Sequence, residues 1–225
     1  MDASWLGGHV DNIGASTGTI DPKDVALKMR LDYAHGVKDP STKVLEAIER
    51  LCWKLEQSNL TNEDLMKETA DLITKHFGIT SVAIAARDSH DGLFRYKVVV
   101  GVDQDAAEGF KKLVYTKEQV TDLSVYPSYE ISSHTRLYLG EDHPYGEGEE
   151  FTYRVPSLVG LEKRKSLTDC IEADYVDFFM YGPNRYLLGW IEVSGTRMRK
   201  LPDSTTIRWL ELIACILGFA LRPKK

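Results

Sequence analysis

The sequence has few cysteines, and they lie far apart. Cys52, Cys170 and Cys215 are the three in 225 residues, and they form no C-x-x-C pair. An odd, scattered set of thiols fits reduced cysteines in a cytosol better than a disulfide framework or a zinc site. We therefore expect neither disulfides nor structural zinc.

The sequence also lacks a long hydrophobic run. Its longest apolar stretch, residues 209–221, is shorter than the about 20 residues that cross a bilayer, and it contains Glu211. The N-terminal segment MDASWLGGHVDNIGASTG has no basic start and no apolar core, so it does not resemble a secretion signal. We expect a cytoplasmic protein with no membrane partner.

Positive charge is in the minority, with 28 Lys and Arg against 34 Asp and Glu and a formal net charge of −6. Because phosphate backbones are bound by concentrated positive charge, we expect no nucleic-acid partner. Glycine-rich phosphate loops, nucleophile elbows and H-E-x-x-H zinc motifs are absent as well. The sequence therefore carries no common catalytic signature.

Hydrophobic residues make up 43% of the chain and charged residues 28%, as in ordinary globular domains. Residues 1–38 are rich in Gly, Asp, Ser and Thr, and apart from a helix-like piece at 23–33 they show no sustained hydrophobic period. This composition is typical of a partly flexible arm or linker. We expect the folded domain to occupy residues 39–225.

Periodic apolar residues predict helices at both ends of this domain. Asp39 and Pro40 form a typical helix start. The helix that follows carries a narrow apolar stripe, which suits packing against another helix, including its own copy in a second subunit. The stripe consists of Val44, Ile48, Leu51 and Leu55.

Two further helices have clear start signals. Thr61 and Asp64 form a capping box for a helix that ends near Phe77, and Pro202 with Asp203 begins the last helix. The predicted buried side of the first of these two helices consists of Leu65, Thr69, Leu72 and Ile73.

Alternating apolar residues predict two antiparallel hairpins, at residues 79–100 and 174–195. The small alanines of the first strand predict close approach of a helix. In the second hairpin, large side chains occupy both faces, so protein or a ligand must cover each face. One face carries Val176, Phe178 and Met180, and the other carries Asp177, Phe179 and Tyr181.

Residues 102–170 separate the hairpins and are the least regular part of the sequence. We expect a short helix around 106–113, a strand at 130–140 and then the acidic, glycine-rich segment GEDHPYGEGEE. Long irregular segments in compact domains tend to be functional. This one is rich in tyrosine, at Tyr115, Tyr126, Tyr129, Tyr138, Tyr145 and Tyr153.

The order of these elements resembles that of a GAF domain, a family of small-molecule sensors related to PAS domains. The likeness covers roughly residues 60–221 and lies in DLMKETADLITKHFG, the strands that follow it, and the closing segment from YLLGWIEVSG to the final helix. The resemblance implies an α+β fold: an antiparallel β-sheet with the N- and C-terminal helices on one face and an insert, 102–170, with short helices and loops over the other.

The resemblance also implies a ligand pocket between the sheet and the insert. Apolar walls with a few polar groups are typical of such pockets. The candidate ligand-contacting residues are Tyr138, His134, Cys170, Phe178 and Tyr115.

Three functional classes of the family can be compared with this sequence. The Asn-Lys, Phe and Asp-Glu signature of cyclic-nucleotide-binding members is not found in order and spacing. Bilin-binding members use a cysteine often followed by histidine, whereas Cys170 precedes Ile171. Free methionine-R-sulfoxide reductases need closely arranged cysteines, and only Cys170 lies near the insert.

Iron is the cofactor for which the sequence offers some ligands. His134 and His143, with Glu141 and Asp142, have the donor types that bind haem or non-haem iron. Their spacing matches no compact metal motif, and the segment reads equally well as a solvated turn. Iron is therefore not favoured, and the cofactor stays unassigned.

We therefore expect a sensor or regulatory module, not an enzyme, that binds a small molecule under the insert. The terminal helices would form a homodimer and carry the signal to an output domain or a partner signalling protein. The alternatives are a thiol-dependent reductase of the methionine-R-sulfoxide type, for which Cys170 would be essential, and a ligand-free dimerisation scaffold.

Overall fold

The computed structural model describes residues 22–36, 40–55, 60–142, 146, 149, 152 and 159–222. The chain separates into two compact units, Met1–Thr42 and Lys43–Lys225. The first contains helix α1, Pro22–Gly36, whose described apolar side chains are exposed to solvent. The second contains the sheet and the elements discussed below, apart from residues 40–42 at the start of the next helix.

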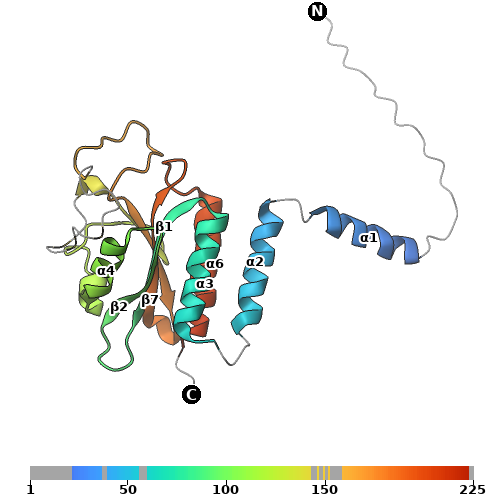
Figure 1. Cartoon of the computed structure of the whole chain (residues 1–225), viewed down its shortest axis with the longest axis horizontal. Coiled ribbons are helices and arrows are strands. Elements are labelled where there is room, and N and C mark those ends of the chain that lie inside the picture. The colour runs from blue at the N-terminus through green and yellow to red at the C-terminus, as the bar shows by residue number, and fades with distance from the viewer. Residues whose placement is uncertain are drawn as a thin grey trace, which may run out of the picture. The chain divides into compact units, whose positions relative to one another are not determined.

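A single antiparallel sheet organises the second unit (Figure 1). Its described strands follow the order β3-β2-β1-β7-β6-β5-β4, and every neighbouring pair is antiparallel. The strands are β1 (Ile79–Arg87), β2 (Phe94–Val100), β3 (Val114–Tyr115), β4 (Tyr129–Ser132), β5 (Thr135–Tyr138), β6 (Tyr175–Tyr181) and β7 (Leu187–Thr196).

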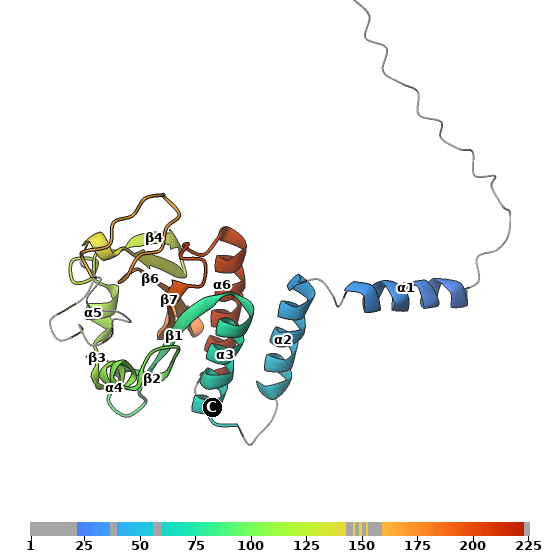
Figure 2. The ribbon, with the colours of Figure 1, turned by 45° about the horizontal axis from the view of Figure 1, so that its top comes forward.

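Helices cover both faces of the sheet. On one face lie α3 (Asn62–His76) and α6 (Ser204–Ala220), and on the other lie α4 (Gln104–Lys112) and α5 (Lys117–Thr121), as Figures 1 and 2 show. This arrangement confirms the predicted α+β architecture. No helix among the described residues combines the length and apolar character needed to cross a bilayer.

Local side-chain caps explain where the helices begin. Thr61 and Asp64 form the predicted capping box of α3, with Thr61 Oγ1 accepting from the backbone N–H of Asp64 at 3.1 Å. Asp203 caps α6 by accepting from the N–H of Thr206 at 2.7 Å. Asp103 caps α4 in the same way, so this helix starts earlier than the predicted residue 106.

The predicted single strand at 130–140 is wrong, because the segment forms the hairpin β4–β5. The chain turns at Ser133 and His134, where Ser132 Oγ accepts from the backbone N–H of His134 at 3.1 Å. Serine side chains favour turns because they satisfy nearby backbone groups. The extra strand extends the sheet beyond the two predicted hairpins.

The stripe on α2 (Pro40–Leu55) packs against its own chain. Val44, Ile48 and Leu51 are buried in one core cluster with residues of α3 and α6. These side chains are therefore already covered, and a dimer would need another surface. Asp39, the predicted cap of this helix, lies outside the described residues.

The two faces of the sheet bury different side chains. Val176, Phe178 and Met180 of β6 belong to the core that contains α3 and α6. Phe179 belongs to a second, largely aromatic cluster on the insert side. The small Ala83 and Ala85 of β1 also face this second cluster, so they make room for aromatic rings and do not face α3 or α6.

Candidate functional site

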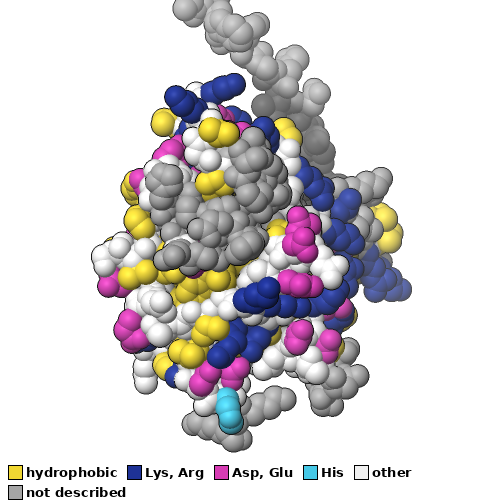
Figure 3. Space-filling view, turned by 60° about the vertical axis from the view of Figure 1, so that its left-hand side comes forward, with side chains coloured by type: hydrophobic (Ala, Val, Ile, Leu, Met, Phe, Trp, Pro, Cys, Tyr) yellow, Lys and Arg dark blue, Asp and Glu magenta, His cyan; other side chains and the backbone are white. Residues whose placement is uncertain are grey.

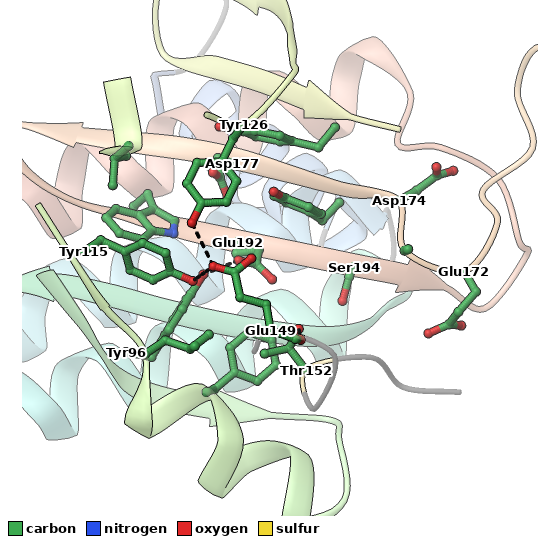
Figure 4. Close-up of a pocket in the computed structure, with 17 residues that line it drawn as sticks. Tyr96, Tyr115, Tyr126, Glu149, Thr152, Glu172, Asp174, Asp177, Glu192 and Ser194 are labelled. Atoms are coloured by element: carbon green, nitrogen blue, oxygen red, sulfur yellow. Dashed lines mark hydrogen bonds between the residues drawn. The ribbon is translucent and has the colours of Figure 1, made fainter. Parts of the chain in front are cut away.

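A cavity of about 80 Å³ lies on the insert side of the sheet, under α4, α5 and residues of the 102–170 segment. Strands β2, β3, β5, β6 and β7 all contribute side chains to its wall (Figure 4). Its lining consists of Tyr96, Phe110, Leu113, Tyr115, Val120, Tyr126, Tyr138, Glu149, Thr152, Glu172, Ala173, Asp174, Tyr175, Asp177, Trp190, Glu192 and Ser194.

Two buried carboxylates form the floor of this pocket. Asp177 of β6 and Glu192 of β7 are directly opposite in the strand register, and they are 5% and 9% exposed. Opposite residues of antiparallel strands have Cβ atoms about 4.5–5.5 Å apart, and like charges there are destabilising. The sheet therefore places two carboxylates together at a site that is unfavourable for stability.

These floor carboxylates have few hydrogen-bond partners. Tyr96 donates a hydrogen bond from its hydroxyl to Glu192 Oε2. In contrast, Asp177 Oδ1 is buried without a hydrogen-bond partner in the described part of the chain. Leaving a buried acceptor unsatisfied costs about 1–3 kcal/mol.

Burial changes the acidity of both carboxyls. Desolvation, reinforced by the charge of Glu149 and opposed by the hydrogen bond from Tyr96, raises the pKa of Glu192 to about 7. Desolvation and the neighbouring charge of Glu192 raise the pKa of Asp177 above its ordinary value, while Tyr138 and Arg136 oppose that rise. Proton occupancy of the floor therefore changes near neutral pH.

A third carboxylate, Glu149, is brought over the pocket by the insert. Its Oε1 accepts hydrogen bonds from the hydroxyls of Tyr115 and Tyr126 at 2.8 and 2.9 Å, and its Oε2 accepts from the backbone N–H of Gly146 at 2.7 Å. Burial raises the pKa values of Tyr115 and Tyr126, so both phenols remain protonated donors. The insert is thereby attached to the aromatic wall.

Aromatic rings surround one end of the pocket. The rings of Tyr96, Tyr115 and Trp190 lie edge to face, with centroids 5.8–6.1 Å apart, and Tyr126 lies 6.1 Å from Tyr115. Tyr96, Ala85 and Trp190 occupy matching positions across β2, β1 and β7, which explains why the rings meet over a small side chain.

Asp174 lies at the other end of the pocket (Figure 4), and its carboxylate forms an ion pair with Arg164. Arg164 Nη2 lies 2.9 Å from each of the two carboxylate oxygens of Asp174, and the backbone N–H groups of Gly140 and Ile171 each donate to this carboxylate at 2.9 Å. Because its oxygens are fully used, Asp174 anchors the loop before β6.

Two of the five predicted ligand-contacting residues line this pocket, namely Tyr115 and Tyr138. Phe178 points into the opposite core, and His134 lies in the β4–β5 turn with its ring 5.3 Å from that of Tyr181. Cys170 is buried beside a separate cavity of about 10 Å³, near Ile79 and Pro202. Contact between these residues and a ligand stays a prediction.

The sequence patterns did not identify three acidic residues of the pocket, namely Asp177, Glu192 and Glu149. A usable signal exists in the sequence, because Asp177 and Glu192 each interrupt an otherwise apolar strand. His143 lies outside the described residues. Within the described ranges, no three His, Cys, Asp or Glu side chains come together as a metal site.

No protein-family model matches the sequence, and a search of curated proteins finds no match. Solved structures do match. The GAF domain of an Acinetobacter phosphoenolpyruvate-protein phosphotransferase is 11% identical, with a TM-score of 0.50, and the match covers 79% of this chain and 91% of that one.

Two other solved structures match slightly less well. The A. aeolicus nlh2 GAF domain is 13% identical, covers 81% of this chain and 97% of its own, and has a TM-score of 0.49. A GAF domain/HD domain protein from Geobacter sulfurreducens is 10% identical, covers 71% and 91%, and also has a TM-score of 0.49. Together with the antiparallel sheet and its two helical layers, the match to the Acinetobacter domain shows that this chain has the GAF fold.

Proposed function

We propose that this protein is a sensory module that binds a small ligand in the pocket under residues 102–170. The observation that carries the proposal is Asp177 Oδ1, a buried acceptor without a described partner that lines a cavity. Such an atom is unfavourable in the empty protein, and a ligand that donates to it would remove the penalty.

Strand β6 offers a direct route from the pocket to the helical face. Asp177 and Phe179 face the insert side, while the intervening Phe178 and the following Met180 pack among the helices. Gly218 of α6 lies so close that a Cβ atom placed there would be 3.3 Å from Met180 Cβ. A shift of β6 on ligand binding would therefore move side chains that contact α6.

A second route links the insert to α6. Glu211 of α6 accepts hydrogen bonds from the hydroxyls of Ser132 and Thr135, at 2.7 Å in the case of Thr135. Thr135 begins β5, the strand that also carries the pocket residue Tyr138. A shift of β5 on ligand binding would thus alter the hydrogen bonds between the turn of the β4–β5 hairpin and α6.

We also propose that the module acts as a homodimer through α6. Leu212, Cys215 and Phe219 are exposed at spacings of three and four residues, which forms a continuous apolar stripe on the outer surface of this helix. The predicted stripe on α2 is not available for this role, because it is buried within the chain. An output domain or partner would respond to a change in the α6 pair.

The geometry favours binding over thiol chemistry. No described residue of the pocket lining is a cysteine, and Cys170 lies beside the separate small cavity. A reductase mechanism needs an attacking and a resolving thiol close to the bound sulfoxide. The reductase alternative therefore receives no support from the position of Cys170.

A thermal-shift screen of small molecules tests the proposed pocket. Ser194 lines the pocket from β7, so Ser194→Phe is designed to fill it, and Ser194→Ala is the matched control (Figure 4). We expect at least one compound to raise the melting temperature of the wild type and the alanine variant but not of the phenylalanine variant. A compound that stabilises all three equally binds elsewhere, and a screen without a hit would count against the proposal.

A further inference from the structure

We infer that the ligand is a small organic cation of the ammonium class, held by Asp177 and Glu192 within the ring of aromatic side chains. The inference rests on the proposed function and narrows it to one ligand chemistry. It follows from the charges, rings and size of the described pocket.

The charge of the pocket wall has one sign. Five carboxylic residues line the cavity, and no Lys, Arg or His is found among its described lining residues. Asp174, which is paired with Arg164, and Glu172 lie at the far end, so the aromatic end retains the three other carboxylic residues (Figure 4). These are Glu149, Asp177 and Glu192.

One cationic side chain acts on the floor of the pocket. Arg136 of β5 is opposite Asp177 in the strand register, and its charge lowers the pKa of Asp177. Its guanidinium group is already engaged, since it donates to the carbonyl oxygen of Val120 at 3.2 Å and lies 5.2 Å from the ring centre of Phe179. One arginine beside three carboxylic residues leaves the pocket short of positive charge.

The outer surface on the insert side differs from the pocket wall in its charge. In the space-filling view of the insert side, acidic and basic side chains are interspersed over the described surface (Figure 3). An anionic ligand would meet several carboxylates at short range in a medium that screens charge poorly. A neutral ligand could hydrogen-bond to the floor but would leave the paired acids uncompensated.

The aromatic wall suits the same ligand class. Tyr96, Tyr115, Tyr126 and Trp190 surround the carboxylates at one end of the pocket. The faces of such rings attract alkylammonium groups, by about 0.5–2 kcal/mol per ring depending on solvation. A carboxylate floor with aromatic walls offers an ammonium ion both a counter-charge and an apolar lining.

The volume limits the size of the cation. One water molecule needs roughly 10–15 Å³ of cavity volume. The cavity of about 80 Å³ therefore accommodates roughly five to eight groups of that size. Choline and ethanolamine are within this range and serve as probes.

Binding of a cation must be linked to loss of a proton from the floor. The pKa of Glu192 is about 7 in the free protein, and an adjacent positive charge would lower it. Below pH 7 the cation has to displace that proton, whereas above pH 7 the carboxylate is already ionised. Affinity should therefore rise about tenfold from pH about 6 to about 8.

Isothermal titration calorimetry of the full chain tests this inference. The probes are choline and ethanolamine, each paired with its neutral carbon analogue, which are an alcohol carrying a tert-butyl group and propanol. We expect at least one cation to bind, its neutral analogue to bind at least about tenfold more weakly, and binding to strengthen with pH. Asp177→Asn and Glu192→Gln should each weaken cation binding about tenfold or more, and Glu130→Gln, which changes an exposed carboxylate of β4, should not.

Any of three results would overturn the inference. These are no binding of either cation, a neutral analogue that binds as tightly as its cation, or unchanged cation binding in both Asp177→Asn and Glu192→Gln. Retained binding in Glu130→Gln shows that effects at the floor are specific. If a neutral or anionic compound binds to the wild type and not to Ser194→Phe, the inference of a cationic ligand is wrong, but the proposed ligand pocket is supported. Circular dichroism of each variant, compared with the wild type, separates loss of binding from loss of folding.

Discussion

At the scale of single residues, the most informative feature is the opposed pair Asp177 and Glu192. Polar residues inside a sheet are rare unless they are satisfied, and two acidic residues directly opposite each other are unfavourable because like charges repel. Here both are buried, and one oxygen of Asp177 has no partner among the described groups. The pair costs stability in the empty protein, which is typical of residues retained for a function.

This cost leads to a pH-dependent prediction for Glu192→Gln. The folded pKa of about 7 exceeds the ordinary value of 4.5, so the folded state binds a proton that the unfolded state has lost. The stabilising effect of that proton is complete below about pH 4.5, falls as pH rises through 7, and is absent above. The glutamine variant should therefore resemble the wild type near pH 5 and be more stable near pH 8, on the order of 3 kcal/mol.

Urea unfolding at the two pH values measures this difference. Glu130→Gln serves as the matched control, because Glu130 is exposed on β4. The prediction fails if Glu192→Gln is less stable than the wild type at pH 8, or if its effect is the same at both pH values.

Phe178 has a structural role on the opposite face of the same strand. It is fully buried among the helices, so Phe178→Ala should lower the free energy of unfolding by about 3–5 kcal/mol through loss of packing and formation of a cavity. Leu161→Ala, at a side chain that is 75% exposed, should lower it by much less. Similar losses in chemical denaturation of the two variants would contradict this placement.

At the scale of elements, the contact between α6 and the β4–β5 hairpin is the one most open to test. Glu211 accepts hydrogen bonds from Ser132 and from the buried hydroxyl of Thr135. Removing this acceptor leaves at least one buried donor unsatisfied, at a cost of about 1–3 kcal/mol. The β4–β5 hairpin should then be held less firmly against α6.

We predict that Glu211→Ala increases amide hydrogen exchange in residues 129–138 and lowers stability by about that amount. Arg208→Ala, at an exposed position of the same helix, should do neither. Mass spectrometry of exchanged peptides gives the local readout. Exchange that rises equally throughout the sheet would indicate general destabilisation, not loss of this contact.

At the scale of the whole molecule, the outer stripe of α6 defines the proposed dimer. Replacing Phe219, which is 65% exposed, by Glu would place charge in the interface without altering the core of the subunit. We predict that Phe219→Glu is monomeric at concentrations where the wild type is dimeric, as measured by analytical ultracentrifugation. Leu45→Glu, at an exposed apolar residue of α2, is the control and should remain dimeric.

The same interface predicts a cross-link. Cys215 is exposed between Leu212 and Phe219, so mild oxidation should join two subunits through this thiol. The covalent dimer should disappear in Cys215→Ser and persist in Cys52→Ser. If the wild type is monomeric and does not cross-link, the proposed dimer is wrong, and the proposed ligand pocket is unaffected.

Much of the fold could be predicted because its signals are local. The cap of α3 joins Thr61 to a residue three positions away, and the alternation that marks β6 repeats every two residues. The tyrosine-rich insert likewise contributed two residues to the pocket wall, Tyr115 and Tyr138. Each of these features depends on neighbours within a few positions along the chain.

The rest depended on the exact register of paired strands and on which distant segments meet. Register between β6 and β7 places Asp177 beside Glu192, and the fold of the insert brings Glu149 to two tyrosines far from it in sequence. Long-range packing also buries Phe178 in the core that contains α3 and α6, and it covers the apolar stripe on α2.

By itself, therefore, the sequence determined the type and order of most elements outside the 102–170 segment, because hydrogen bonding and hydrophobic periodicity act over short spans. The buried side of α3 was also readable from the sequence, but only the tertiary structure decided what covers each face of the sheet and which charges share a pocket. Those outcomes depend on strand register and on contacts between residues 15 or more positions apart, and local patterns do not specify such contacts.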